Sequence, residues 1–351
     1  MTNPMTHVLL KDCIEAIGNS PERFNALKNE TVFISGGTGF VGTWIAEMLA
    51  YLNDHYAFNT KMILLSEHAF SFSSKAPHLA TRKDVAIVEK DVRNLIELPR
   101  EVTYIIHAAA NPDNRQHSSD PLKVMDVISR GTGAVLNAAS RLPNIKNILN
   151  ISSGLIYGPQ PQDMECIPET AHGGPDCDSI LSIYSEAKRY AETLCTAYRN
   201  QFKLPIVTVR PFAFIGPYQL LDKPWAINNF IRDSLLGGPI RILGDENTVR
   251  SYMYASDMAV WLLTILINGK PGQSYNVGSP NGISLKQLAE CIASHFPATP
   301  EIVHVPVNKA ALKSRFVPDV ALAQKSLALT ITVNINEAIK RTMMWHKDRG
   351  I

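Results

Sequence analysis

Short apolar segments alternate with helical stretches along most of this chain, beginning at Thr31. Each segment is rich in β-branched residues and almost free of charge. Strands of this kind are buried on both faces and belong to a parallel sheet whose connections are helices. We therefore predict an α/β fold. Its expected strands are residues 31–35, 62–65, 85–88, 104–107, 147–151 and 206–209.

Two further parts flank this pattern. Before residue 30, Leu9, Cys13 and Ile17 share a helical spacing that stops at Gly18. This predicts an N-terminal helical extension over residues 1–29, which docks on the fold or on a partner subunit, or serves as a regulatory arm. After Pro211, Pro and Gly become frequent, and we expect a smaller C-terminal α/β lobe over residues 211–351. Its expected helices are residues 226–237, 256–268, 284–295 and 334–346.

Composition narrows the class of protein. The 351 residues are 45% hydrophobic and 19% charged with a net charge of +2, which is ordinary for a globular protein. Without a concentrated basic stripe, nucleic acid is not an expected partner. Five scattered cysteines offer no zinc spacing and suit a reducing cytoplasm. No apolar run approaches the roughly 20 residues of a spanning helix. We expect a cytoplasmic protein without a metal or membrane partner.

A glycine-rich segment, residues 35–42, follows the first expected strand and runs into a helix. Gly36 permits a tight turn, Gly39 lets backbone N–H groups approach a pyrophosphate, and Gly42 lets the helix pack closely on the strand. The helix N-terminus adds positive potential for phosphates. This order predicts a Rossmann-type doubly wound sheet over residues 30–210 that binds NAD or NADP. The expected contacts in the loop are Gly36, Thr38, Gly39, Phe40, Val41 and Gly42.

The end of the second strand normally sets the choice of cofactor, through an acid for the ribose or an arginine for the extra phosphate. Here Ser66 takes the place of the acid and leaves room for a phosphate, whereas the neighbouring Glu67 would repel one. No arginine is present, so we expect NAD and leave NADP open. Asp91, after the third strand, would bind the adenine amino group or equally well cap a helix. Further expected cofactor contacts are Val92, Ala108, Ala109 and Ala110.

Tyr184 and Lys188 lie four residues apart, on one face of an expected helix. A phenol is a poor base at neutral pH, but a nearby ammonium group and a positive nicotinamide ring stabilise the phenolate. Tyr184 can then take a proton from a substrate hydroxyl while hydride leaves the same carbon. Ser153, at the end of an earlier strand, can hydrogen-bond the reacting oxygen. Together the three residues predict a hydride-transfer enzyme.

With these motifs, the chain resembles the extended short-chain dehydrogenase/reductases, specifically the nucleotide-sugar epimerases and dehydratases, over about residues 30–347. The matching segments include GGTGFVG at 36–42, HAAA at 107–110, SSGLIYG at 152–158, YSEAK at 184–188 and YNVG at 275–278. The resemblance implies a nucleoside-diphosphate sugar as substrate, held by the C-terminal lobe. It implies that Arg250 contacts the diphosphate and that Asn229 and Arg315 contact the nucleotide. It also implies a homodimer formed through helices within 120–141 and 184–201.

The residues beside Ser153 depart from that family pattern. The family's 4,6-dehydratases carry an Asp-Glu pair there to move protons, and its decarboxylases keep an acid at the second position. This chain has Gly154 and Leu155, neither of which can exchange a proton. Two asparagines common in the family are also replaced, by Ile128 and Ala213.

The leading interpretation is an enzyme that oxidises or reduces C4 of a nucleotide sugar, as a 4-epimerase or a 4-ketoreductase. Either reaction needs Ser153, Tyr184 and Lys188 and no further acid. A 4,6-dehydratase is an alternative if acids from elsewhere reach the sugar. The candidates are Asp113, Glu165 and Asp178. A non-catalytic NAD(P)-binding regulator on the same fold is the alternative from another class, although such a protein has no need of Tyr184 and Lys188 in register.

Overall fold

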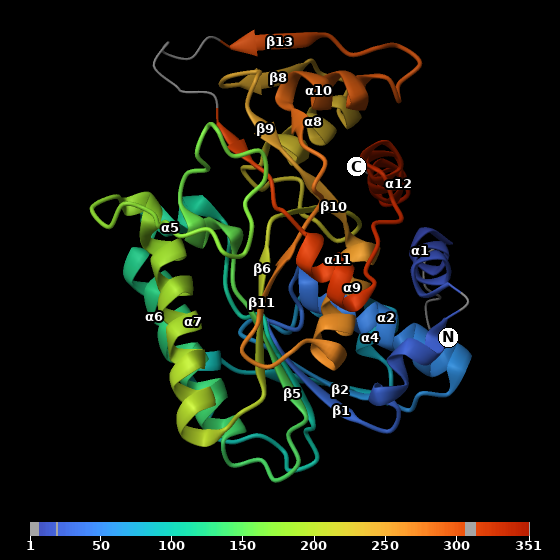
Figure 1. Cartoon of the computed structure of the whole chain (residues 1–351). Coiled ribbons are helices and arrows are strands. Elements are labelled where there is room, and N and C mark those ends of the chain that lie inside the picture. The colour runs from blue at the N-terminus through green and yellow to red at the C-terminus, as the bar shows by residue number, and fades with distance from the viewer. Residues whose placement is uncertain (1–6, 19, 306–313, 351) are drawn as a thin grey trace.

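A seven-stranded sheet forms the centre of the molecule (Figure 1). The computed structural model describes residues 7–18, 20–305 and 314–350. All neighbouring strands of this sheet run parallel, in the order β11-β6-β5-β4-β1-β2-β3. The strands are β1 Thr31–Ser35, β2 Lys61–Ser66, β3 Val85–Glu89, β4 Tyr104–His107, β5 Asn147–Ile151, β6 Ile206–Pro211 and β11 Ser274–Val277. The strand order reverses between β1 and β4, and ligands bind beside such a reversal.

Helices cover both faces of the sheet, which confirms the doubly wound fold (Figure 1). One face carries α2 Phe40–Tyr56 and α9 Ala255–Asn268, and the other carries α6 Pro121–Ala139 and α7 Ile183–Phe202. Successive strand residues point to opposite faces. Accordingly, Ile34 packs in the core under α2 and α9, whereas Phe33 packs in the core under α6 and α7. The strands are apolar on both sides because both sides are covered.

Short helices complete the carboxyl edge of the sheet. They are α3 Phe72–Lys75, α4 Pro77–Ala80, α5 Asn114–Ser119 and the 3₁₀ helices η2 Val92–Asn94, η3 Gly154–Tyr157 and η4 Ile180–Ser182. The six expected strands are all present, within one or two residues of their predicted ends. β11 was not predicted, because its sequence SYNV alternates polar and apolar residues and lacks an apolar run.

The second part of the chain builds its own core above the carboxyl edge of the large sheet (Figure 1). The four helices expected after Pro211 are present as α8 Ala226–Leu235, α9, α10 Leu285–Ala293 and α12 Ile335–Lys347, and α11 Ala321–Leu327 adds a fifth. Its strands are β7 Ala213–Ile215, β8 Ile240–Leu243, β9 Val249–Arg250, β10 Tyr252–Tyr254, β12 Ile283–Ser284, β13 Ile302–Val305 and β14 Arg315–Phe316. Within this stretch, β11 and α9 return to the large sheet, so the two parts share chain segments.

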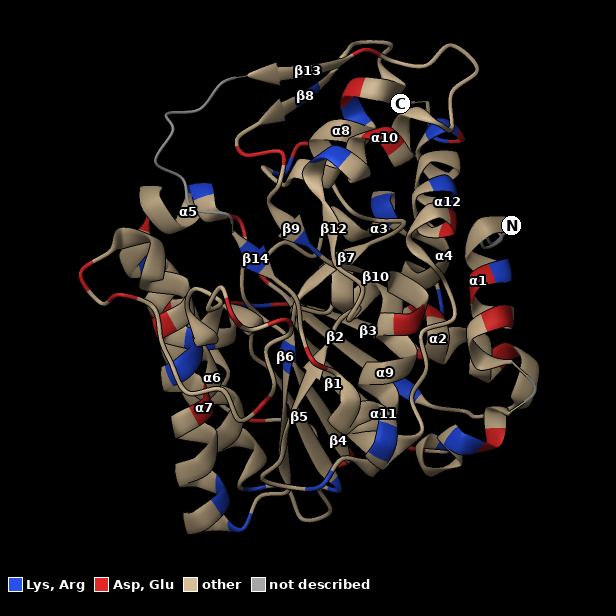
Figure 2. Ribbon diagram, turned by 45° about the horizontal axis from the view of Figure 1, so that its top comes forward, with Lys and Arg blue, Asp and Glu red and all other residues tan. Residues whose placement is uncertain are grey.

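The N-terminal helix α1 His7–Ile17 packs on its own chain, against α9, α2 and α12, and is followed by the 3₁₀ helix η1 Pro21–Leu27. Its fully buried Asp12 accepts hydrogen bonds from Arg341 Nη1 of α12 and from the Tyr254 hydroxyl, both at 2.6 Å. Burial raises the pKa of Asp12 to about 6 in spite of these two partners. A buried ion pair therefore joins the two ends of the chain, at α1 and α12 (Figure 2).

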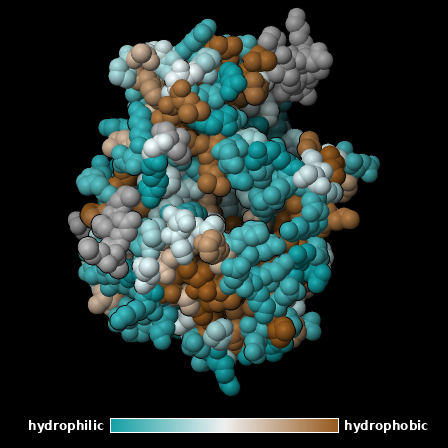
Figure 3. Space-filling view, turned by 180° about the vertical axis from the view of Figure 1, so that it is seen from behind, coloured by the Kyte–Doolittle hydropathy of each residue, from teal (hydrophilic) through white to brown (hydrophobic). Residues whose placement is uncertain are grey.

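Charged residues of both signs are interspersed over the ribbon (Figure 2). Seen from behind, most of the surface is hydrophilic, with hydrophobic residues in smaller groups (Figure 3). In the part of the chain that the structure describes, no helix combines the length and the apolar character needed to cross a bilayer.

We predict that Asp12→Ala lowers the free energy of unfolding by about 3 kcal/mol, because it leaves the Arg341 guanidinium and the Tyr254 hydroxyl without their buried acceptor. Urea denaturation followed by circular dichroism measures this. Lys11→Ala, on the solvent side of the same helix, is the control and should change stability by less than about 0.5 kcal/mol. Equal stability of the two variants would show that the ion pair does not fasten α1.

Candidate active site

The glycine loop connects β1 to α2 and brings the chain very close to β4. Gly36 has φ +69°, and a Cβ added there would lie 2.9 Å from the carbonyl carbon and oxygen of Ala108. A Cβ on Gly42 would lie 2.6 Å from the Cα of Gly37, so the first turn of α2 rests directly on the loop. Gly39 is the N-cap and supplies no capping side chain, which leaves the first N–H groups of α2 for a ligand.

A lysine that the sequence analysis missed lies beside this loop. Lys75, the last residue of α3, donates through Nζ to the Thr38 carbonyl oxygen and to Thr43 Oγ1, both at 2.9 Å. The Thr38 hydroxyl in turn donates to Ser66 Oγ at 2.6 Å. Burial lowers the pKa of Lys75 to about 8. Its ammonium group adds to the positive potential at the start of α2 and holds the loop in shape.

The ends of β2 and β3 carry the other expected cofactor residues. Glu67 is exposed and lies 3.5 Å from Lys123 Nζ of α6, beyond Ser66. Asp91 accepts the Arg93 backbone N–H at 2.8 Å and caps η2, which is one of the two roles expected for it. Its contact with adenine stays a prediction. Val92 is buried, whereas Phe40, Val41 and the residues 108–110 are half-buried around the loop.

Ser153, Tyr184 and Lys188 come together as the sequence predicts, and all three are buried. Ser153 follows β5 and caps η3, whereas Tyr184 and Lys188 lie on α7. Burial raises the pKa of Tyr184, and a hydrogen bond with the Ser153 side chain opposes that shift. Burial also lowers the pKa of Lys188 to about 8, with Nζ donating to the Ile151 carbonyl oxygen at 2.7 Å. The phenol is therefore protonated at neutral pH, and a cation lies 5.8 Å from its ring centre.

A buried chain of hydrogen bonds holds the strand ends around these groups. Thr132 Oγ1 donates to the Ile128 carbonyl oxygen at 2.6 Å, so it accepts from His107 Nε2, 2.9 Å away. Ser35 Oγ then donates to His107 Nδ1 at 2.7 Å. Burial lowers the pKa of His107 to about 3, which keeps the ring neutral. This residue ties β1, β4 and α6 together next to the glycine loop.

Packing leaves no room for an acid directly after Ser153. A Cβ on Gly154 would lie 2.7 Å from Cε2 of the Phe212 ring and 2.9 Å from two further ring carbons. Phe212 is itself held by Phe316, with the ring centres 4.5 Å apart. Leu155 is partly exposed and carries no polar group. The structure thus gives a physical reason for Gly154: the Phe212 ring occupies the space that a side chain at this position would need.

Of the acids proposed for a dehydratase, one is held by cations and two are exposed. Asp113 caps α5 and pairs with Arg115 at 2.6 Å and with Lys223 at 3.2 Å, and these cations hold its pKa well below the usual range. Glu165 and Asp178 are exposed. A carboxylate held between two cations cannot donate a proton at neutral pH.

Two of the expected substrate residues are neighbours in the second part of the chain. Arg250 on β9 and Arg315 on β14 lie on paired strands, although they are far apart in sequence. Arg250 donates to Ser314 Oγ at 3.1 Å, and Arg315 Nε donates to the Glu165 carbonyl oxygen at 2.7 Å. Asn229 is half-buried on α8. Contact of all three with a nucleotide stays a prediction.

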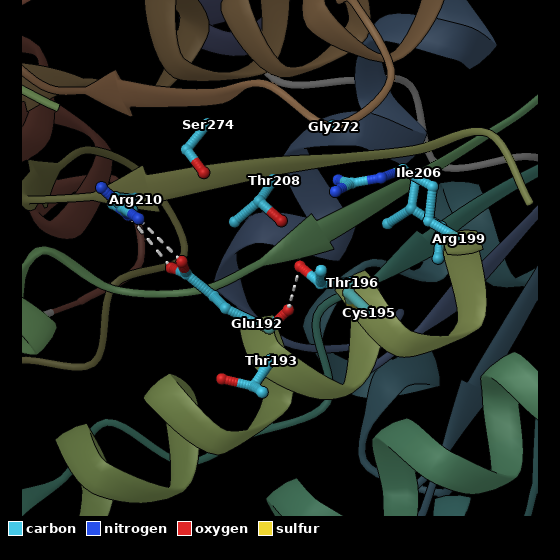
Figure 4. A pocket seen from close by; sticks show the side chains of 10 residues that line it. All are labelled: Glu192, Thr193, Cys195, Thr196, Arg199, Ile206, Thr208, Arg210, Gly272 and Ser274. Carbon is cyan, nitrogen blue, oxygen red and sulfur yellow. Dashed lines mark hydrogen bonds and ion pairs between the residues drawn. The ribbon is translucent and has the colours of Figure 1, made fainter. Parts of the chain in front are cut away.

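A polar cavity of about 340 Å³ lies along later turns of α7 (Figure 4). The Glu192 carboxylate, which lines it, accepts two hydrogen bonds from Arg210, at 3.1 and 2.8 Å. Ile206 and Gly272, also in the lining, lie at the amino ends of β6 and β11. Ligands of this architecture bind at the carboxyl ends, so this cavity is separate from the catalytic residues.

Comparison with known proteins is decisive for the family. A model described as the NAD dependent epimerase/dehydratase family matches residues 32–278. The chain belongs to this family. It is therefore an enzyme of an NAD-dependent class, as expected. UDP-glucuronic acid decarboxylase 1 of Arabidopsis thaliana is 25% identical over 322 residues, covering 92% of this chain and 71% of the relative.

A second relative has several activities. A trifunctional UDP-glucose 4,6-dehydratase, 3,5-epimerase and reductase of the same plant is 28% identical over 334 residues, and the match covers 91% of this chain but 47% of the relative. This chain thus spans about half of that protein. Among solved structures, the UDP-glucose 4-epimerase of Thermotoga maritima has the same fold, with a TM-score of 0.77 at 20% identity over 91% of this chain and 99% of the other.

The glycine loop and the start of α2, which together form the nucleotide cradle, fit NAD. Gly36 and the uncapped start of α2 offer a surface that a side chain would fill, at the point where a pyrophosphate would lie. Ser66 ends β2, Asp91 follows β3, and Tyr184 and Lys188 lie on α7. Their contacts with the adenosine and with the nicotinamide ribose stay predictions.

We predict that Gly36→Ala weakens NAD binding at least about tenfold, because the methyl group would collide with Ala108 and separate the loop from β4. Isothermal titration calorimetry with NAD measures this. Gly237→Ala is the matched control, since Gly237 also has a positive φ, +74°, but an added Cβ there meets nothing within 4 Å. If both variants lose the same affinity for NAD, the close contact between Gly36 and Ala108 is not what forms the NAD-binding site.

Proposed function

We propose that this enzyme transfers hydride at C4 of a nucleoside-diphosphate sugar, as a 4-epimerase or a 4-ketoreductase. The observation that carries this is the aromatic ring of Phe212 over Gly154. The site has a hydroxyl, a phenol and an ammonium group, but no acid beside them for eliminating water or assisting loss of carbon dioxide. The relatives named as UDP-sugar enzymes support a nucleotide sugar as the substrate.

Each catalytic side chain has one task in this proposal. The Ser153 Oγ accepts the Leu155 N–H at 3.1 Å, and its hydroxyl, which hydrogen-bonds Tyr184 in this structure, can turn to the reacting sugar oxygen when substrate binds. Tyr184 donates a proton to that oxygen during reduction and accepts it during oxidation. Lys188 stabilises the phenolate by its charge. NAD, when bound, takes hydride from the sugar carbon or returns it.

We place the sugar nucleotide between the catalytic residues and the lobe formed mainly by residues 211–351. Arg250 and Arg315 suit a diphosphate because a guanidinium group pairs with phosphate oxygens through two parallel hydrogen bonds. Both side chains hydrogen-bond only protein oxygen atoms within the described residues. Asn229 is proposed to contact the nucleotide from α8.

We also propose that the enzyme is a homodimer that packs through α6 and α7. Leu122 and Tyr190 support this, since they are 80% and 53% exposed on these helices. By contrast, Ala187 and Ala191 of α7 pack within the chain. All five cysteines, which lie among the described residues, are free thiols, in keeping with action in the cytoplasm.

The reaction itself can be tested with a 4-keto nucleotide sugar and NADH. Stoichiometric oxidation of NADH at 340 nm would identify a 4-ketoreductase. Interconversion of two 4-epimers without net consumption of NADH would identify a 4-epimerase. Conversion of a nucleotide hexose to its 4-keto-6-deoxy product without added cofactor would instead refute the proposal.

We predict that Tyr184→Phe lowers kcat by a factor of about 10² to 10⁴, because the proton donor is lost. NAD affinity should change little, since the ring and Lys188 remain. Steady-state kinetics and calorimetry on the same preparation separate the two effects. Tyr190→Phe, on the exposed side of the same helix, should behave as the wild type. Full activity of Tyr184→Phe would remove Tyr184 from the mechanism.

A further inference from the structure

A histidine lies flat on the catalytic phenol. The ring of His117, on α5, stacks on the Tyr184 ring with their centres 4.7 Å apart and their planes 9° from parallel. His117 is 3% exposed and Tyr184 is 6% exposed. Val124 and Ile128 of α6 belong to the same apolar cluster as Tyr184. The buried phenol therefore has aliphatic neighbours from α6 and a stacked aromatic ring from α5.

The position of His117 is held by contacts at the N-terminal end of α5. Its Nε2 lies 2.9 Å from the Asn111 carbonyl oxygen, a contact that requires the proton to be on Nε2. Asp113, the N-cap of α5, is bonded to Arg115 of the same helix and to Lys223, in the segment that leads into α8. The short helix is therefore fastened to the loop before it and to the second part of the chain.

We propose that His117 is a positioning residue for Tyr184: its ring keeps the phenol dry and fixes the direction of the hydroxyl. The proposal rests on Tyr184 as the proton-transferring group of the proposed function. Stacked aromatic rings prefer such close, nearly parallel arrangements. A phenol swinging about χ1 towards α5 would strike the His117 ring, so the stack limits where the hydroxyl oxygen can lie.

The stacking of His117 also affects the pKa of Tyr184. Burial is the largest cause of the raised pKa of Tyr184, and His117 provides part of that burial. The titratable groups in contact with the phenol are His117 from α5, through the stack, and Lys188 from α7, whose Nζ lies 5.8 Å from the ring centre. Removing the His117 ring admits water, which favours the phenolate and lowers the pKa of Tyr184. Oxidation of the sugar needs the phenolate. The low-pH limb of the kcat profile for oxidation should then move to lower pH.

The test compares two variants that each keep one property of His117. His117→Phe keeps the stacked ring and loses the hydrogen bond to Asn111. His117→Gln keeps a donor and loses the ring. We expect kcat of His117→Gln to fall about tenfold at unchanged KM, because the phenol is no longer oriented, with the acid limb of its kcat profile shifted to lower pH. His117→Phe should stay within about threefold of the wild type without a shift.

Ser118→Ala, on the exposed side of α5, is the control for general damage to the helix and should match the wild type. Should His117→Gln not fold, His117→Asn makes the same comparison, since it keeps an amide donor and leaves the space of the ring open to water. Equal losses in the Phe and Gln variants, or an unshifted acid limb in Gln or Asn, would overturn the proposal. Tyr184→Phe is run in parallel: if it stays active, the proposed function fails, whatever the His117 variants do.

Discussion

The close approach of β1 to β4 at their carboxyl ends is the constraint on which the site depends. His107 accepts from Ser35 and donates to Thr132, so one neutral buried ring ties the two strands to α6. Gly36 can then touch Ala108, which an added methyl group would prevent. The nucleotide cradle lies on this junction, and β5 beside it carries Ser153 and the carbonyl that anchors Lys188. The proposed cofactor and proton-transfer sites therefore share the carboxyl ends of β1, β4 and β5.

Packing around that edge limits the chemistry. Phe212 stands where a side chain at position 154 would need to be, and Phe316 holds Phe212 in place. A polar acid at this point would require the aromatic pair to move, which supports the proposed chemistry of one hydride and one proton. The enclosure of Tyr184 by His117 acts in the same direction, since a dry and fixed phenol suits transfer to one defined oxygen.

The two parts of the chain are joined at several points, which suits a site that lies between them. β11 and α9 enter the large sheet from the second part of the sequence. Asp12 joins α1 to α12 and to Tyr254, at the end of β10. Lys223 joins the second part to α5, and thus to the helix that carries His117. Through these contacts α5 touches both the second part of the chain and the Tyr184 ring.

The sequence by itself determined the sheet, the glycine loop and the Ser153, Tyr184 and Lys188 set. Each of these is encoded by local spacing: apolar runs, glycines where a turn needs them, and a four-residue step on one helix face. It could not determine the partners of isolated polar residues. The segment NRQHSS has no apolar pattern that would place His117 on Tyr184, and Asp12 lies 329 positions from Arg341. Lys75, Phe212 over Gly154 and strand β11 were likewise decided by tertiary structure, because only folding brings distant segments close enough for their shape and charge to act on one another.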